Sequence, residues 1–159
     1  MPNWCINILT VSGPSWQKFD EAFQGPRTVW GEDLDDDSPL TLSVPPEERV
    51  KIREYCLNAL YPVPIEVMAR GYDDYELLRK PHPTATFYKR LSRLAELYGK
   101  SYTTDEIVHL LLNINKIPCG YDWQKTHWGT KWDITNVAVE FYSEEQVCYR
   151  FDTAWAPPL

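Results

Sequence analysis

The chain has 159 residues, which is the size of one domain and enough for a substantial hydrophobic core. Hydrophobic residues make up 43% and charged residues 25% of the sequence, and no window approaches the roughly 18 consecutive apolar residues that cross a bilayer. The 16 basic and 23 acidic residues give a net charge of −7, which repels phosphate backbones. The composition therefore excludes a membrane-spanning or disordered chain and argues against generic nucleic-acid binding.

The cysteine pattern and the first residues indicate a cytosolic protein. The four cysteines lie far apart and form no CxxC pair, unlike the dense disulfide framework of a secreted domain. Residues Met1–Trp4 lack the basic and apolar regions of a signal peptide. Cys119 and His127 are too few donors for a zinc site. We therefore expect reduced thiols, no metal and no cofactor.

The chain is predicted to open with a strand followed by a helix. Residues 5–11 are apolar on both faces, with Ile6 and Ile8 on one of them, which indicates a central strand. Aromatic residues then recur at helical spacing from Trp16 to Phe23.

An acidic segment follows this helix. Five of the seven residues from Gly31 to Asp37 are carboxylates, a density that a core cannot pack. A solvated loop is the simplest interpretation, and an acidic docking loop for a partner protein is the alternative. The five carboxylates are Glu32, Asp33, Asp35, Asp36 and Asp37.

Residues 45–60 are predicted to form short elements, and residues 137–153 are predicted to form a β-hairpin. Residues 45–60 fit either helix or strand, and we predict a short helical turn followed by a strand up to Pro62. Residues 137–142 and 147–153 alternate apolar and polar side chains on either side of a turn, which predicts a β-hairpin.

Residues 71–118 are predicted to be a helical insertion within a single domain. An apolar stripe over 87–98 indicates one helix, which Gly99 ends. Thr103 and Glu106 have the spacing of a capping box and start a second helix. We expect the two helices to form a hairpin against the sheet. The first helix carries three basic residues that are candidates for an interaction, Lys89, Arg90 and Arg93.

Residues 121–133 are the densest group of chemically active side chains. They include three Trp, and Gly129 suits the positive φ that ends a helix. His127, Lys131 and Asp133 form a candidate acid/base set. We favour a structural interpretation, in which Asp133 caps backbone amides and Lys131 lays its stem across an indole. No catalytic residues are predicted.

Four motifs follow one another along the chain. They are Met1-Pro2-Asn3-Trp4-Cys5-x-Asn7-x-Leu9-x-Val11-x-Gly13, Tyr61-Pro62-Val63-Pro64, Tyr121-Asp122-Trp123 with Trp128-Gly129-Thr130-Lys131-Trp132-Asp133, and Phe151-Asp152-Thr153-Ala154-Trp155-x-Pro157-Pro158. Together they resemble the YubB-like family of small phage and plasmid proteins with a ferredoxin-like domain. The resemblance covers nearly the whole chain and implies no established activity.

The resemblance implies an α+β fold, a ferredoxin-like antiparallel sheet packed with helices. Relatives have a much shorter link in place of residues 71–118 and continue through a further helix and strand after the Pro-Pro pair. The sheet is therefore expected to lack a strand and part of its cover. We expect the inserted helices or another protein chain to supply that cover.

The motif residues are given structural roles. Indoles that flank the first and last strands are expected to gather with those of the 121–133 segment, namely Trp4, Trp128, Trp132 and Trp155. Asn7 on an apolar strand face needs a hydrogen-bond partner, for which Asp152 and Thr130 are the candidates.

We expect a non-enzymatic phage or plasmid accessory protein in the cytoplasm of a bacterial host, which binds a host protein and in this way inhibits a defence system. Two alternatives stay open. One is a small-ligand binder, such as a sponge for a nucleotide signal, with Lys131, Arg90 or Arg93 meeting phosphate. The other is an enzyme that uses His127, Lys131 and Asp133. Nucleic acid and membranes are not expected as partners, and self-association is left open.

Overall fold

Antiparallel strands and short helices share the chain, as the α+β prediction requires. The computed structural model describes residues 3–35 and 44–155, the last of these by its backbone only. They form two compact units. The sheet unit comprises residues 1–27, 52–62 and 124–159, and the helical unit comprises residues 28–51 and 63–123.

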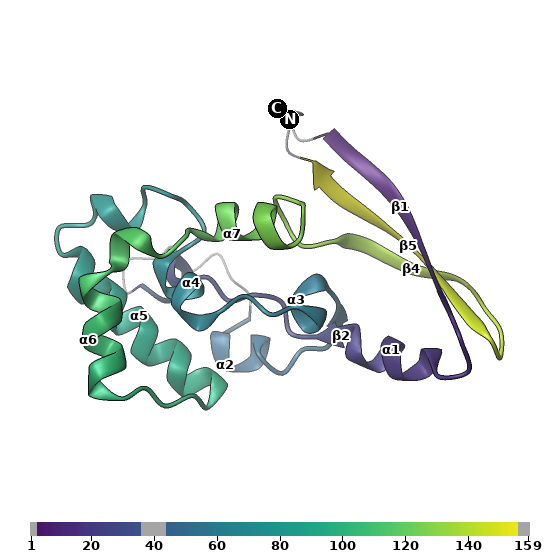
Figure 1. Cartoon of the computed structure of the whole chain (residues 1–159), viewed down its shortest axis with the longest axis horizontal. Helices are drawn as coiled ribbons and strands as arrows, with labels where there is room; N and C mark the ends of the chain where they lie inside the picture. Colours follow the sequence, from purple (N-terminus) through teal and green to yellow (C-terminus); the bar gives the residue numbers. More distant parts are fainter. Residues whose placement is uncertain (1–2, 36–43, 156–159) are drawn as a thin grey trace. The chain divides into compact units, whose positions relative to one another are not determined.

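The sheet unit is built on three antiparallel strands in the order β1-β5-β4 (Figure 1). These are β1 (Asn3–Ser12), β4 (Thr135–Tyr142) and β5 (Gln146–Trp155). The predicted β4–β5 hairpin is confirmed. The prediction that the first strand is central is wrong, because β1 lies at the edge of the described sheet. Its second apolar face is open: Ile6 is 58% and Ile8 70% exposed.

The two strand pairings differ in regularity. β1 and β5 pair without interruption from Asn3 opposite Trp155 to Ser12 opposite Gln146. Along β4 the register shifts twice, between Thr135 and Ala138 and between Val139 and Phe141. Shifts of this kind are β-bulges, which bend and twist a strand.

An aromatic core fills the covered face of the sheet. Phe23, which follows α1 (Trp16–Ala22), packs with Ile134, Val147 and Tyr149, all of them at most 1% exposed. The rings of Phe23 and Tyr149 meet edge to face with centroids 5.2 Å apart. This geometry is the favourable one for aromatic pairs.

Two-residue strands and a helical turn complete the sheet unit. β2 (Gln24–Gly25) pairs with β3 (Glu54–Tyr55), and α3 (Leu57–Leu60) follows. The strand that we expected up to Pro62 is therefore wrong beyond Tyr55. A tertiary contact decides the difference, because the carboxylate of Asp133 accepts hydrogen bonds from the first amides of α3.

The helical unit contains both helices that the sequence predicts within residues 71–118. Its α-helices are α2 (Pro46–Arg49), α4 (Ile65–Arg70), α5 (Pro83–Tyr98) and α6 (Thr104–Leu112), and α7 (Gly120–His127) contributes residues to both units. Gly99 ends α5 with φ 66°, and Thr103 Oγ1 accepts the Glu106 N–H at 3.2 Å, so both predicted helix boundaries are confirmed. α5 packs on α4 and also contacts α6 (Figure 1).

The state of the cysteines and the length of the helices can be given for the described residues. All four cysteines are free thiols. No helix within the described ranges is long and apolar enough to cross a bilayer.

We predict that Tyr149→Phe lowers the free energy of unfolding by about 1.5–3 kcal/mol, the range for a hydrogen bond to a charged group. Tyr149 is fully buried, and its hydroxyl donates to Asp20 Oδ1 at 2.7 Å. Tyr55 donates to the same oxygen at 2.8 Å. Urea denaturation measures the change. The control is Tyr142→Phe, a ring that is 69% exposed, and an equal loss in both variants would contradict the prediction.

Candidate functional site

The side of the three-stranded sheet opposite its aromatic core carries large apolar side chains. Because side chains alternate along a strand, the register places one set of residues from each strand on this side. Trp4 is 51% exposed and Phe141 52% exposed, alongside the isoleucines of β1. We call this set the open face. Its members are Trp4, Ile6 and Ile8 of β1, Cys148, Arg150 and Asp152 of β5, and Ala138 and Phe141 of β4.

The open face is hollowed beside its central strand. A cavity of about 440 Å³ is lined by residues of all three strands, namely Trp4, Ile6, Thr135, Asn136, Arg150 and Asp152. Within it, the Asn136 side chain donates to Asp152 Oδ2 at 2.8 Å. Arg150 is half-exposed and lies 3.9 Å from Glu140. The cavity thus has an indole and an isoleucine in its wall and a guanidinium available for hydrogen bonds.

The predicted gathering of indoles is confirmed for one pair. Trp4 and Trp132 lie in contact, with ring centroids 5.7 Å apart. Trp128 instead donates its Nε1–H to the Tyr61 carbonyl at 3.0 Å. The side chain of Trp155 lies outside the described residues. The Trp4–Trp132 pair is half-exposed, so these rings border the open face and are not part of the core.

The side chains of Asn7 and Thr130 make hydrogen bonds within the sheet unit. The Asn7 amide donates to Thr153 Oγ1 at 2.8 Å and to the Cys5 carbonyl at 3.0 Å. Thr130 Oγ1 donates to the Ala154 carbonyl at 2.6 Å. The structural role expected for Asn7 is present, with Thr153 as its partner in place of the two residues that we considered.

The candidate acid/base residues are held by the fold. Asp133 accepts the N–H groups of Leu57 at 2.6 Å, Asn58 at 3.2 Å and Ile134 at 2.8 Å. Burial raises the pKa of Asp133, and these amides partly offset the effect. The His127 ring stacks on Tyr61. Gly129, which lies between His127 and Asp133 in the sequence, has the predicted positive φ of 71°.

We predict that Asp133→Ala destabilises the fold, because three backbone amides lose their acceptor. Loss of a cap costs about 1 kcal/mol, and unpaired buried donors add about 1–3 kcal/mol. Thermal denaturation with far-UV circular dichroism measures the loss. Lys131→Ala is the matched control from the same set. An Asp133→Ala chain as stable as the parent would return the residue to the list of catalytic candidates.

The acidic segment and the basic helix meet inside the helical unit. Arg90 is only 1% exposed, and its guanidinium binds Asp35 at 2.9 and 2.5 Å and Glu76 at 2.8 Å. Lys80 adds a second cation, 3.4 Å from Asp35. Although burial alone would raise the pKa of Asp35, the hydrogen bonds and charges of Arg90 and Lys80 lower it overall.

Other residues of these two sets are also engaged. Glu32 accepts the Tyr72 N–H at 2.9 Å, and burial raises its pKa. The remaining contacts join Asp33 to Arg49 and Arg93 to Glu47, while Lys89 is exposed and Asp36 and Asp37 lie outside the described residues. The Asp35–Arg90 pair therefore joins the two patterns that we treated as separate surfaces. Periodicity could not reveal the pairing, because the partners are 55 residues apart in sequence.

We predict that Arg90→Met lowers the free energy of unfolding by about 3–5 kcal/mol at pH 7, the cost of removing one partner of a buried ion pair, although Lys80 stays beside Asp35. The control is Lys89→Met, on the exposed side of the same helix. The pKa of Asp35 is lowered in the folded state, so the contribution of this pair is present above pH 3.8 and is lost as the pH falls through the lowered value. Urea denaturation at neutral and acidic pH measures both effects. An Arg90→Met loss no larger than that of Lys89→Met would contradict the prediction.

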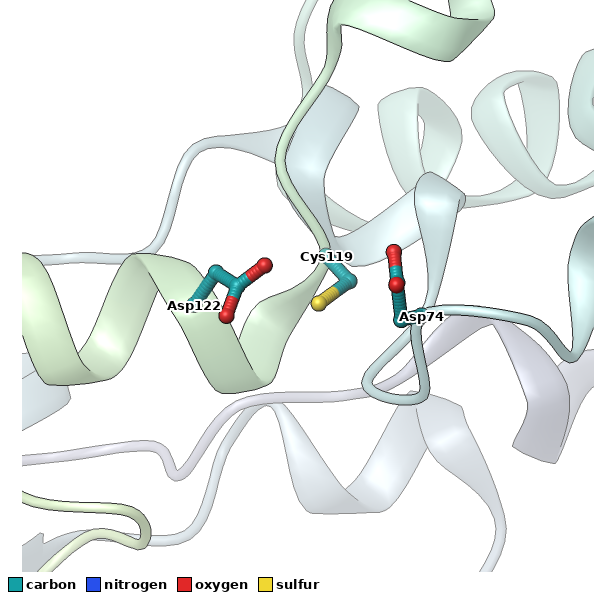
Figure 2. A group of neighbouring side chains, drawn as sticks. All are labelled: Asp74, Cys119 and Asp122. Carbon is teal, nitrogen blue, oxygen red and sulfur yellow. The ribbon is translucent and has the colours of Figure 1, made fainter. Parts of the chain in front are cut away.

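A third cluster surrounds the start of α7. Figure 2 shows Cys119 between Asp74 and Asp122, and the donor atoms of the three residues lie within 4.8 Å of one another. From the sequence, Cys119 was considered as a metal ligand with His127 and not with these carboxylates. The Cys-x-x-Asp spacing at a helix start is the signal that could have paired Cys119 with Asp122, since it has the spacing of a capping box.

The fold accounts for this cluster without an ion. The Cys119 carbonyl accepts the Trp123 N–H, which begins α7, and burial raises the pKa of the Cys119 thiol. Asp74 already has a cation beside it, because Arg70 Nη2 lies 3.6 Å from its carboxylate. A raised thiol pKa and a competing guanidinium both oppose metal binding.

We compared the chain with protein-family models, curated proteins and solved structures. None of the three comparisons gave a significant match. The resemblance to the YubB-like family, and the ferredoxin-like topology that it implies, therefore stay predictions.

Proposed function

We propose that this chain is a non-enzymatic accessory protein that binds a partner protein through the open face of its sheet. The carrying observation is the exposure of large apolar side chains on that face, Trp4, Ile6, Ile8 and Phe141, each at least half-exposed. Large exposed apolar side chains on one side of a sheet are typical of an interaction site in soluble proteins.

The composition of the face favours a protein as the partner. Binding hot spots are enriched in Trp, Tyr and Arg and lie near the centre of an interface. Arg150 occupies the central strand, with Ile8 opposite it on one side and Ala138 on the other. Trp4 and Trp132 provide a rigid aromatic rim. The face thus combines a central guanidinium with apolar anchors.

Charge and contacts weigh against the alternatives. Asp152 and Glu140 lie beside Arg150, and the chain carries a net charge of −7, so a phosphate backbone is disfavoured. Two of the three cations proposed to meet the phosphate of a nucleotide are used elsewhere: Arg90 is buried in its ion network and Arg93 contacts Glu47. Of the candidate acid/base set, Asp133 accepts hydrogen bonds from backbone N–H groups, which gives it a structural role.

The family resemblance supplies the biological setting of the proposal. A small phage or plasmid protein with no catalytic set acts by occupying a host protein, and inhibition of a defence system is the role that we propose. The described part of the acidic segment is engaged within the helical unit, which supports the open face as the docking surface in its place.

The test compares two variants that introduce the same charge. Phe141→Glu changes the open face, and Leu112→Glu changes an equally apolar residue of α6 that is 79% exposed. Immobilised parent and variant chains are incubated with lysate of a bacterial host, and retained proteins are quantified by mass spectrometry. We expect a partner held by the parent and by Leu112→Glu but reduced at least about tenfold with Phe141→Glu, since one buried large side chain is worth about 1.5–3 kcal/mol.

Circular dichroism confirms that both variants are folded. Equal retention by Phe141→Glu and the parent, or equal loss in both variants, would reject the open face as the binding surface. Arg150→Ala is the second variant on the same face and should give the same selective loss.

A further inference from the structure

We propose that two copies of this chain associate through their β1 strands, which pair antiparallel about a two-fold axis and join the two sheets into one of six strands. The inference concerns the edge of the sheet and not its open face, so it does not rest on the proposed function. It is carried by the backbone geometry, the side chains and the sequence symmetry of β1.

The outer edge of β1 has backbone groups without strand partners in the described residues. In an antiparallel pair, residues that exchange hydrogen bonds alternate with residues that do not. The Gly13 N–H donates to the Glu145 carbonyl at 2.6 Å, in register with the β1–β5 pairing, so the odd-numbered residues of β1 bond to β5. Ala154 lies opposite Trp4, an even-numbered residue, and its carbonyl accepts the Lys131 N–H and not a hydrogen bond from β1. This agrees with hydrogen bonding to β5 by the odd-numbered residues of β1. The groups that point outward are those of Trp4, Ile6, Ile8, Thr10 and Ser12.

The two edges of the sheet differ in how they resist pairing. Soluble proteins protect edge strands with charges, prolines and bulges. β4 has two shifts of register and carries Glu140. The ten residues of β1 include no charged residue and no proline, and their pairing with β5 is uninterrupted. β1 is therefore the edge that accepts another strand.

The sequence of β1 fits a second copy of itself. Cys5-Ile6-Asn7-Ile8-Leu9 is nearly symmetric about Asn7. A two-fold axis at Asn7 places Ile6 of each copy opposite Ile8 of the other, and Trp4 opposite Thr10, all with outward backbone groups. β-Branched cross-strand pairs are favourable, and a self-complementary patch is what a two-fold dimer requires. Although each chain carries a charge of −7, this contact brings no like charges together.

Proline at an outward position tests the pairing. Ile8→Pro removes an N–H that points away from β5, so the intramolecular ladder keeps its hydrogen bonds. Ile8→Val keeps the N–H and is the matched control. Analytical ultracentrifugation is expected to give twice the chain mass for the parent and Ile8→Val, and a single chain mass for folded Ile8→Pro. Ile6→Lys, which places a charge on the edge, is the second variant if Ile8→Pro does not fold.

Hydrogen exchange gives a readout specific to the edge. In the parent, amides of both odd and even residues of β1 are expected to be protected, whereas the monomeric variant loses protection at even positions such as Ile6 and Thr10 only. A monomeric parent overturns the proposal. A dimer that survives both edge variants, or one whose even-numbered amides exchange freely, also overturns it. Phe141→Glu, which tests the open face, leaves β1 unchanged and is expected to remain dimeric, so the two proposals fail separately.

Discussion

The uninterrupted pairing of β1 with β5 is the constraint on which the sheet unit depends. Because the register is continuous over ten residues, it fixes which side chains enter the core and which remain outside. Leu9 and Val11 face Phe23 and Tyr149, while Ile6 and Ile8 are left exposed. A slip of one residue would exchange these faces. The open face is therefore a product of the same register that builds the core.

Charged groups in this protein mainly stabilise its fold. Asp20 binds two tyrosine hydroxyls, and burial raises the pKa of Tyr55 to about 12. Asp133 caps α3, and Arg90 is enclosed by carboxylates. Each of these groups is far in sequence from its partner. Asp35 and Arg90, which looked like parts of two binding surfaces, are therefore partners in one intramolecular contact.

Local signals predicted those parts of the fold whose determinants are local. The stripe over 87–98 with Gly99, the capping pair Thr103–Glu106 and the alternation of 137–153 all gave the correct elements. β1 was placed wrongly because apolar residues on two faces indicate burial only if something covers both faces. Residues 57–60 were assigned to a strand because their cap, Asp133, lies 76 residues away from Leu57.

The candidate surface could be only partly predicted for the same reason. Trp4, which flanks the first strand, was expected to meet Trp132 of the 121–133 segment, and the two rings are in contact. Arg150 was not considered, because a single arginine in a strand is an ordinary solvent-facing residue until the strand order places it at the centre. Which side of the sheet is covered depends on where α1 packs. That packing is a tertiary contact, which local sequence patterns do not reveal.

The sheet unit is assembled from segments that leave the ribosome at very different times. β1 is made first, but β5, its partner, is made last, and most of the helical unit is synthesised between them. Closing so long a loop is slow, since folding rates fall as contacts become more distant in sequence. β1, which has no charged residue, consequently stays without β5 on the nascent chain until β5 is synthesised. During that time a chaperone or a neighbouring polysome can bind it. Fast folding of the intervening helices, whose contacts are more local, shortens the distance that β1 and β5 must search.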